Sequence, residues 1–223
     1  MLTTQKEKLK TILDKLLILG QSTLSTNEQI LQALKHCDSC KLSKVTVLSK
    51  KQRYKAIDEV DNLIINVFAL YSPEARDLRE LVAFLKITNE FDRIANSSNS
   101  FIRDFPNAIS SEVDKDFILE YAIPLQKSSV NALSNALNLL KANDKQFVDE
   151  HYKAVIIEES KNDDLYKIIE KSLLKKINNE VHLSSDYQNI MAALRRLEKI
   201  ADRALSIANL MHYAKIGGEL GKV

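Results

Sequence analysis

Apolar residues return at every third or fourth position along almost the whole chain, which keeps their side chains on one side of an α-helix. This periodicity predicts an all-α fold of six long helices. Polar stretches near residues 38–44, 107–112 and 142–144 interrupt the pattern and predict turns or linkers. The expected helices run from about Gln5 to Lys35, Val45 to Leu70, Ser72 to Phe105, Val113 to Leu140, Lys145 to Ile177, and Ser185 to Gly217.

Local signals mark the ends of two of these helices. Ser72 followed by Pro73 is typical of a helix start, because serine accepts from an unpaired backbone N–H and proline has no N–H to leave unpaired. Ser185 and Gln188 have the spacing of a capping box and predict the start of the last helix. Gly217 predicts its end, since glycine readily terminates helices.

The third expected helix carries polar side chains on a face that should be apolar. Leu78, Leu81 and Asp92 lie on one side of it, and Asn89 and Asn96 flank the carboxylate. Burying an unpaired ion costs several kcal/mol, so the charge on this face needs a partner.

The second expected helix shows a similar interruption. Asp61 lies in the middle of its apolar face, and Asp58 lies at the edge of that face. The residues predicted to face the core are Tyr54, Ile57, Ile64, Ile65 and Phe68. The basic run on this helix is interpreted as a solvated face: Lys50, Lys51, Arg53 and Lys55.

An internal repeat relates the two halves of the chain. Residues 91–96, FDRIAN, match residues 197–202, LEKIAD, in apolar, acidic and basic character, with an amide against an acid at the last place. Upstream, residues 61–63 match residues 163–165 in the same order and at nearly the same separation. We therefore expect two tandem, homologous three-helix bundles, over residues 1–106 and 107–223.

Composition agrees with long helices. The 223 residues include only four glycines and three prolines, too few for a sheet with many tight turns. The formal net charge of +2 argues against a chain dominated by nucleic-acid binding. No apolar run approaches the length of a membrane span, so we expect no membrane insertion and a cytoplasmic location.

The acidic residues suggest a metal site. Glu198 and Asp202, four residues apart, project from one helix face, and acids of the preceding helix are expected to meet them. Oxygen ligands of this kind suit hard cations. The alternative is a solvated acidic edge, neutralised by basic neighbours such as Lys199 and Arg203. The predicted metal ligands are Asp61, Asp92, Asn96, Glu159, Asp163, Glu198 and Asp202, with Asp58 as a further candidate.

Signals for an enzyme are weak. No Glu-x-x-His, phosphate-binding glycine loop or nucleophile elbow occurs in the sequence, so we expect no catalytic activity. A metal-dependent enzyme, acting for instance on a phosphoester, is kept as an alternative hypothesis. Cys37 and Cys40 form a single CxxC beside His36, which is interpreted as a pair of reduced thiols near a helix end.

The order of these segments resembles the PhoU family of phosphate-uptake regulators. The resemblance rests on SPEARDLRELVAFLKITNEFDRIAN in the first half and AALRRLEKIADRALSIAN in the second, and it covers nearly the whole chain. It implies two homologous three-helix bundles, each with an acid-x-x-x-Asp motif on its third helix. Glu198 and Asp202 match that motif, as does Asp92, whereas Asn96 stands where the family has aspartate.

The resemblance also implies a function. Similar proteins bind iron or other metals through these acids; here the cation is left open among iron, manganese, magnesium and zinc. They negatively regulate a phosphate ABC transporter and phosphate-starvation signalling, with transporter subunits and a sensor histidine kinase as partners, and they often form homodimers. The alternatives are a metal-free helical interaction module and an accessory protein of another phosphate carrier.

Overall fold

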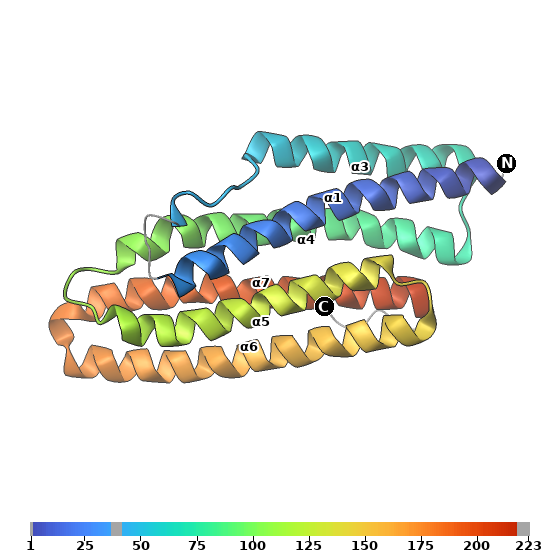
Figure 1. Ribbon diagram of the computed structural model, residues 1–223. Helices are drawn as coiled ribbons and strands as arrows, with labels where there is room; N and C mark the ends of the chain where they lie inside the picture. The colour runs from blue at the N-terminus through green and yellow to red at the C-terminus, as the bar shows by residue number, and fades with distance from the viewer. Residues whose placement is uncertain (1, 37–41, 218–223) are drawn as a thin grey trace.

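The computed structural model describes residues 2–36 and 42–217, with the side chains of the first helix described from residue 5 onward. Six long helices lie alongside one another in an elongated bundle (Figure 1). No strand occurs in these two ranges, which agrees with the predicted all-α fold. The helices are α1 (Leu2–Lys35), α3 (Lys50–Tyr71), α4 (Ala75–Ala108), α5 (Lys115–Lys141), α6 (Lys145–Asn179) and α7 (Ser184–Ile216), with the 3₁₀ turn η1 (Val181–Leu183) before α7.

The helices form four layers. Helix α3 packs on α1 and α4, and α6 packs on α5 and α7, so that α3 and α6 are the two outer layers (Figure 1). The most extensive contact in the described part of the chain joins α4 to α7, and α1 also packs on α5. The three helices of each half thus form a bundle, and the two bundles share one continuous core. The division near residue 106 stays a prediction.

Side-chain caps explain several helix starts. Ser49 and Gln52 form a reciprocal capping box at the start of α3. The Asp114 side chain accepts from the backbone N–H of Phe117, 3.1 Å away, and Asp144 accepts from that of Gln146 at 2.8 Å.

Two predicted helix starts, one predicted end and one predicted capping box are wrong. The second expected helix begins at Lys50 and not near Val45. Ser72 ends α3 in the left-handed conformation, with φ at 45°, and α4 begins only at Ala75. The last helix begins at Ser184 without a side-chain cap, so Ser185 and Gln188 form no capping box there. Helix α4 continues through Pro106 to Ala108. Gly217 does follow the end of α7, with φ at 86°.

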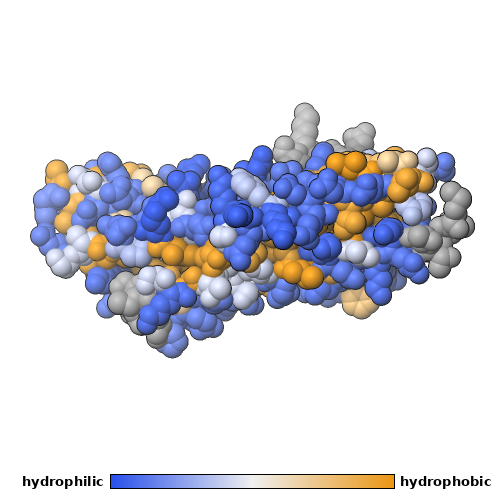
Figure 2. Space-filling view, turned by 90° about the horizontal axis from the view of Figure 1, so that it is seen from above, coloured by the Kyte–Doolittle hydropathy of each residue, from blue (hydrophilic) through white to orange (hydrophobic). Residues whose placement is uncertain are grey.

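The predicted face of α3 is also partly wrong. Tyr54 and Ile65 are 44% and 55% exposed, and the buried residues of this helix are Arg53, Ile57, Val60, Ile64 and Val67. Their spacing of four, three, four and three residues is that of a single buried stripe. Figure 2, seen from the α3 side, shows hydrophobic residues scattered among hydrophilic ones on this outer surface.

Burial follows the internal repeat. Buried positions of α4 correspond to buried positions of α7 at a separation of 106 residues, as for Phe91 and Leu197 or Ile94 and Ile200. The same holds for α3 and α6 at a separation of 102, as for Ile64 and Tyr166. The two halves therefore use the same helix faces. No helix in the described ranges is long and apolar enough to cross a membrane.

Candidate metal centre

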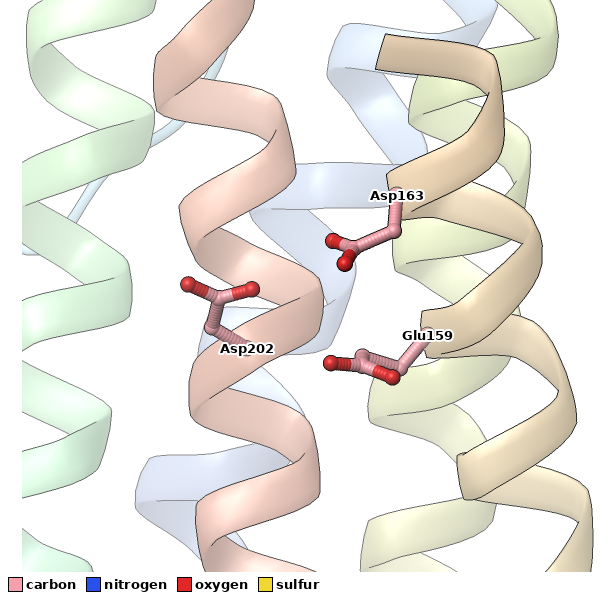
Figure 3. Close-up of side chains that lie close together, drawn as sticks. All are labelled: Glu159, Asp163 and Asp202. Atoms are coloured by element: carbon pink, nitrogen blue, oxygen red, sulfur yellow. The ribbon is translucent and has the colours of Figure 1, made fainter. Parts of the chain in front are cut away.

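Three of the predicted ligands meet between α6 and α7. Glu159 and Asp163 lie one turn apart on α6 and extend toward α7, from which Asp202 faces them (Figure 3). One carboxylate oxygen from each residue lies within 4.8 Å of the others. All three side chains are half-buried, so this group of acids lies at the edge of the core and remains open to solvent.

Glu198, the fourth acid, lies one turn before Asp202 on α7. Its side chain is only 12% exposed, and its Oε2 atom is buried and accepts no hydrogen bond. Burial raises the pKa of Glu198 above its ordinary value, and the nearby Asp202 carboxylate raises that pKa further. The positive group beside this oxygen is the ammonium of Lys199, whose Nζ atom lies 3.3 Å away.

Mutual repulsion acts on the α6 side of the cluster as well. Burial is the main cause that raises the pKa of Glu159, and the charges of Asp163 and Asp202 add to it. These acids would hold their charges more easily with a cation between them, because an opposite charge within a few ångströms favours the ionised form.

Lys199 supplies part of the missing positive charge. Its Nζ atom lies 2.6 Å from Asp202 Oδ2 and 3.3 Å from Glu198 Oε2. The hydrogen bond to Asp202 raises the pKa of Lys199, so the ammonium stays charged at neutral pH. Lys199, together with Arg195, whose charge also acts on Glu198, cannot balance four carboxylates. The cluster of Glu159, Asp163, Glu198 and Asp202 keeps a net negative charge and an oxygen-only donor set, which fits a hard cation.

The corresponding acids of the first bundle are arranged differently. Asp92 and Asn96 lie on α4, but their side chains contact Arg53 of α3. Asp61 accepts a hydrogen bond from Thr88 Oγ1 at 3.2 Å, and burial raises its pKa. In the described part of the chain, Asp61, Asp92 and Asn96 do not form a carboxylate group comparable to that of Glu159, Asp163 and Asp202.

Arg53 contacts two of the predicted ligands, Asp92 and Asn96, and its position differs from the one that the sequence predicts. The basic run predicts a solvated side chain, yet the residue is 2% exposed. The signal was present in its position, since Arg53 precedes Ile57, Val60 and Ile64 at helical core spacing. The CxxC of Cys37 and Cys40 lies outside the described residues.

Fold and site together define a class of helical proteins: two three-helix repeats, with an acidic pair on the last helix of the second. The family model described as PhoU domain matches residues 16–104 and 125–211, one match in each bundle. The chain belongs to the PhoU family.

Curated relatives agree with this assignment. The chain is 23% identical over 197 residues to a phosphate-specific transport system accessory protein PhoU homolog of Zymomonas mobilis, covering 85% of this chain and 77% of that protein. A homolog of the same name from Borreliella burgdorferi is 25% identical over 162 residues, 71% of each chain.

Two PhoU crystal structures share the fold. PhoU from Pseudomonas aeruginosa superimposes with a TM-score of 0.79 at 21% identity, over 96% of this chain and 99% of that one. PhoU from Streptococcus pneumoniae, described as a phosphate transport system regulatory protein, gives 0.80 at 16% identity, over 98% and 100%. The two-bundle architecture is therefore shared along nearly the whole chain.

Proposed function

We propose that this protein is a regulatory accessory protein of phosphate transport that negatively regulates a phosphate ABC transporter and phosphate-starvation signalling. The observation that carries the proposal is the match of both bundles to the PhoU domain. The names of the curated relatives support it, since they describe accessory proteins of phosphate-specific transport systems. As partners we propose transporter subunits and a sensor histidine kinase, with a homodimer acting in the cytoplasm.

The α6–α7 cluster is proposed as a metal site. Glu159 and Asp163 would hold the cation from α6, and Glu198 and Asp202 from α7. A bound cation such as Mn²⁺ or Fe³⁺ would neutralise the carboxylates and link the two helices. Lys199 would then give up its hydrogen bond to Asp202. No catalytic role is proposed for these acids.

The regulatory role is tested in the source organism by deleting the gene. Alkaline phosphatase should then be expressed in high phosphate, and the wild-type gene should restore repression. Full repression in the deletion strain would contradict the proposed role. Asp163→Asn tests the cluster in the same assay, with Asp164→Asn as its matched control. Asp164 is the adjacent acid, 76% exposed at its side chain and paired with Lys167 at 3.4 Å.

A metal-free interaction module is the second candidate, and the ammonium of Lys199 on Asp202 favours it. Elemental analysis of protein purified without an affinity tag separates the two. Metal that is retained by the wild type and by Asp164→Asn, but lost from Asp202→Asn, would exclude the metal-free candidate.

A further inference from the structure

We propose that Arg53 serves as the built-in cation of the first bundle, so that metal binding is confined to the second bundle. This inference rests on the metal role proposed for the α6–α7 cluster. It concerns the difference between the two halves, which the repeat alone does not predict.

The guanidinium of Arg53 holds the acidic motif of α4. Its Nε atom donates to Asp92 Oδ1 at 3.0 Å, and Nη2 donates to Asn96 Oδ1 at 2.6 Å. The remaining nitrogen, Nη1, donates to the backbone carbonyl of Leu48 at 3.1 Å. Asn96 Nδ2 in turn donates to Asp92 Oδ2 at 2.9 Å. All three oxygens that the motif offers to a cation are therefore already hydrogen-bonded.

The repeat shows which residues differ between the two halves. At the separation of 102 residues, Arg53 corresponds to Val155, which is fully buried in α6, and Ile57 corresponds to Glu159. At the separation of 106, Asn96 corresponds to Asp202. The first bundle thus has a cation in place of an apolar residue and neutral side chains in place of two acids.

These differences all reduce the net negative charge that a metal ion would neutralise in the first bundle. The second bundle has four acids, of which Glu198 and Asp202 contact Lys199, whereas in the first bundle Asp92 is balanced by the buried charge of Arg53. Arginine stays protonated in proteins, so a change of pH does not free the motif. A metal ion at Asp92 and Asn96 would have to displace a buried guanidinium, leaving that charge unpaired in the core.

Metal content of point variants tests the proposal. EDTA-treated protein is dialysed against Mn²⁺, and the bound manganese per chain is measured by inductively coupled plasma mass spectrometry. Asp92→Asn should keep the wild-type Mn²⁺ content, and Asp202→Asn should lose most of it. A loss of about half the bound Mn²⁺ on Asp92→Asn would overturn the proposal.

A designed gain of metal tests the converse. Arg53→Val, Ile57→Glu and Asn96→Asp remove the arginine and give the first bundle, with Asp61 and Asp92, four acids at the positions that correspond to Glu159, Asp163, Glu198 and Asp202. Bound Mn²⁺ per chain should then rise about twofold. A folded triple variant that binds no more Mn²⁺ than the wild type would overturn the role of Arg53 in excluding metal. If circular dichroism shows that this variant does not fold, the Asp92→Asn measurement decides.

A measurement in EDTA separates this proposal from the metal role itself. Arg53→Met should lower the melting temperature of metal-free protein by about 10 °C, because it leaves Asp92 in a half-buried site without its cation. Lys55→Met, at an exposed position of the same helix, is the matched control and should change it little. A wild type that binds no Mn²⁺ would contradict the metal role. An unchanged melting temperature of Arg53→Met would contradict the built-in cation.

Discussion

Gly20 lies where α1 packs against both α4 and α5, and we predict that Gly20→Ala destabilises the protein. A Cβ atom at Gly20 would clash with Leu137 Cδ2 of α5 and would lie 2.7 Å from Phe91 Cζ of α4. Both contacts are far shorter than ordinary van der Waals contact. Leu137 is 2% exposed and Phe91 is fully buried, so neither side chain can move aside into solvent.

Two opposing terms set the size of the effect. Alanine in a helix is favoured over glycine by about 1 kcal/mol, and this term alone would stabilise the variant. Adding a methyl group to a filled core costs about 1–3 kcal/mol. The contacts at Gly20 place the cost at the upper end, so the free energy of unfolding should fall by about 1–2 kcal/mol. For a chain of this length the melting temperature should fall by about 2–8 °C.

The neighbouring residue provides the control. Gln21 is exposed on the same helix, and the difference between Gln21→Ala and Gln21→Gly measures the helix-propensity term without the packing term. Thermal unfolding followed by circular dichroism should show alanine more stable than glycine at position 21 and less stable at position 20. A rise in melting temperature on Gly20→Ala would refute the close packing of α1 between α4 and α5.

Three further predictions concern α6 and α7. Asn162→Ala should lower the free energy of unfolding in urea by about 1–3 kcal/mol, because the buried Asn162 Nδ2 donates to Leu125 O at 2.8 Å and to two serine hydroxyls. An unchanged urea midpoint would contradict this. Lys199→Met should raise Mn²⁺ affinity about tenfold by calorimetry, since it removes the ammonium that competes for Asp202; an equal or weaker affinity would show that Lys199 does not compete. Glu198→Gln should raise the melting temperature of metal-free protein at pH 7. The pKa of Glu198 is raised above its ordinary 4.5, so the folded state binds its proton more tightly, and the advantage of glutamine should disappear as the pH falls through that raised pKa toward 4.5. An advantage that persists at pH 4.5 would point to packing as its source.

The helices and their duplication could be predicted because both depend on patterns within the sequence. Hydrophobic spacing gave the six helices, and the matches at residues 91–96 and 61–63 gave the two bundles. The helix ends were harder to predict. Ser72 and Pro73 are as typical of a connection between two helices as they are of a helix start. In the structure, Ser72 ends α3 in the left-handed conformation. A local signal cannot show which of two adjoining helices it belongs to.

The buried face of α3 shows why the sequence predicts the wrong core residues for this helix. Tyr54 and Ile65 are apolar in type and lie close to the buried stripe. Within the described residues, however, α3 packs on α1 and α4 alone, and such an outer helix buries a narrow face. Residue type alone therefore predicts that Tyr54 is buried and that its neighbour Arg53 is exposed. In the structure Arg53 takes the buried position, because its long side chain can reach from there to Asp92.

Both acidic motifs were visible in the sequence, but the difference between them was not. Asn96 stands where the resemblance implies an acid, but the sequence does not show what takes the place of the missing charge. Only the packing of α3 on α4 brings Arg53 to Asp92, whereas the packing of α6 on α7 brings Glu159 and Asp163 to Asp202. A duplicated motif whose two copies have such different partners need not have one function. In the first bundle Asp92 is paired with Arg53 within the chain, whereas the four acids of the second bundle are the ones that we propose bind a cation from solution.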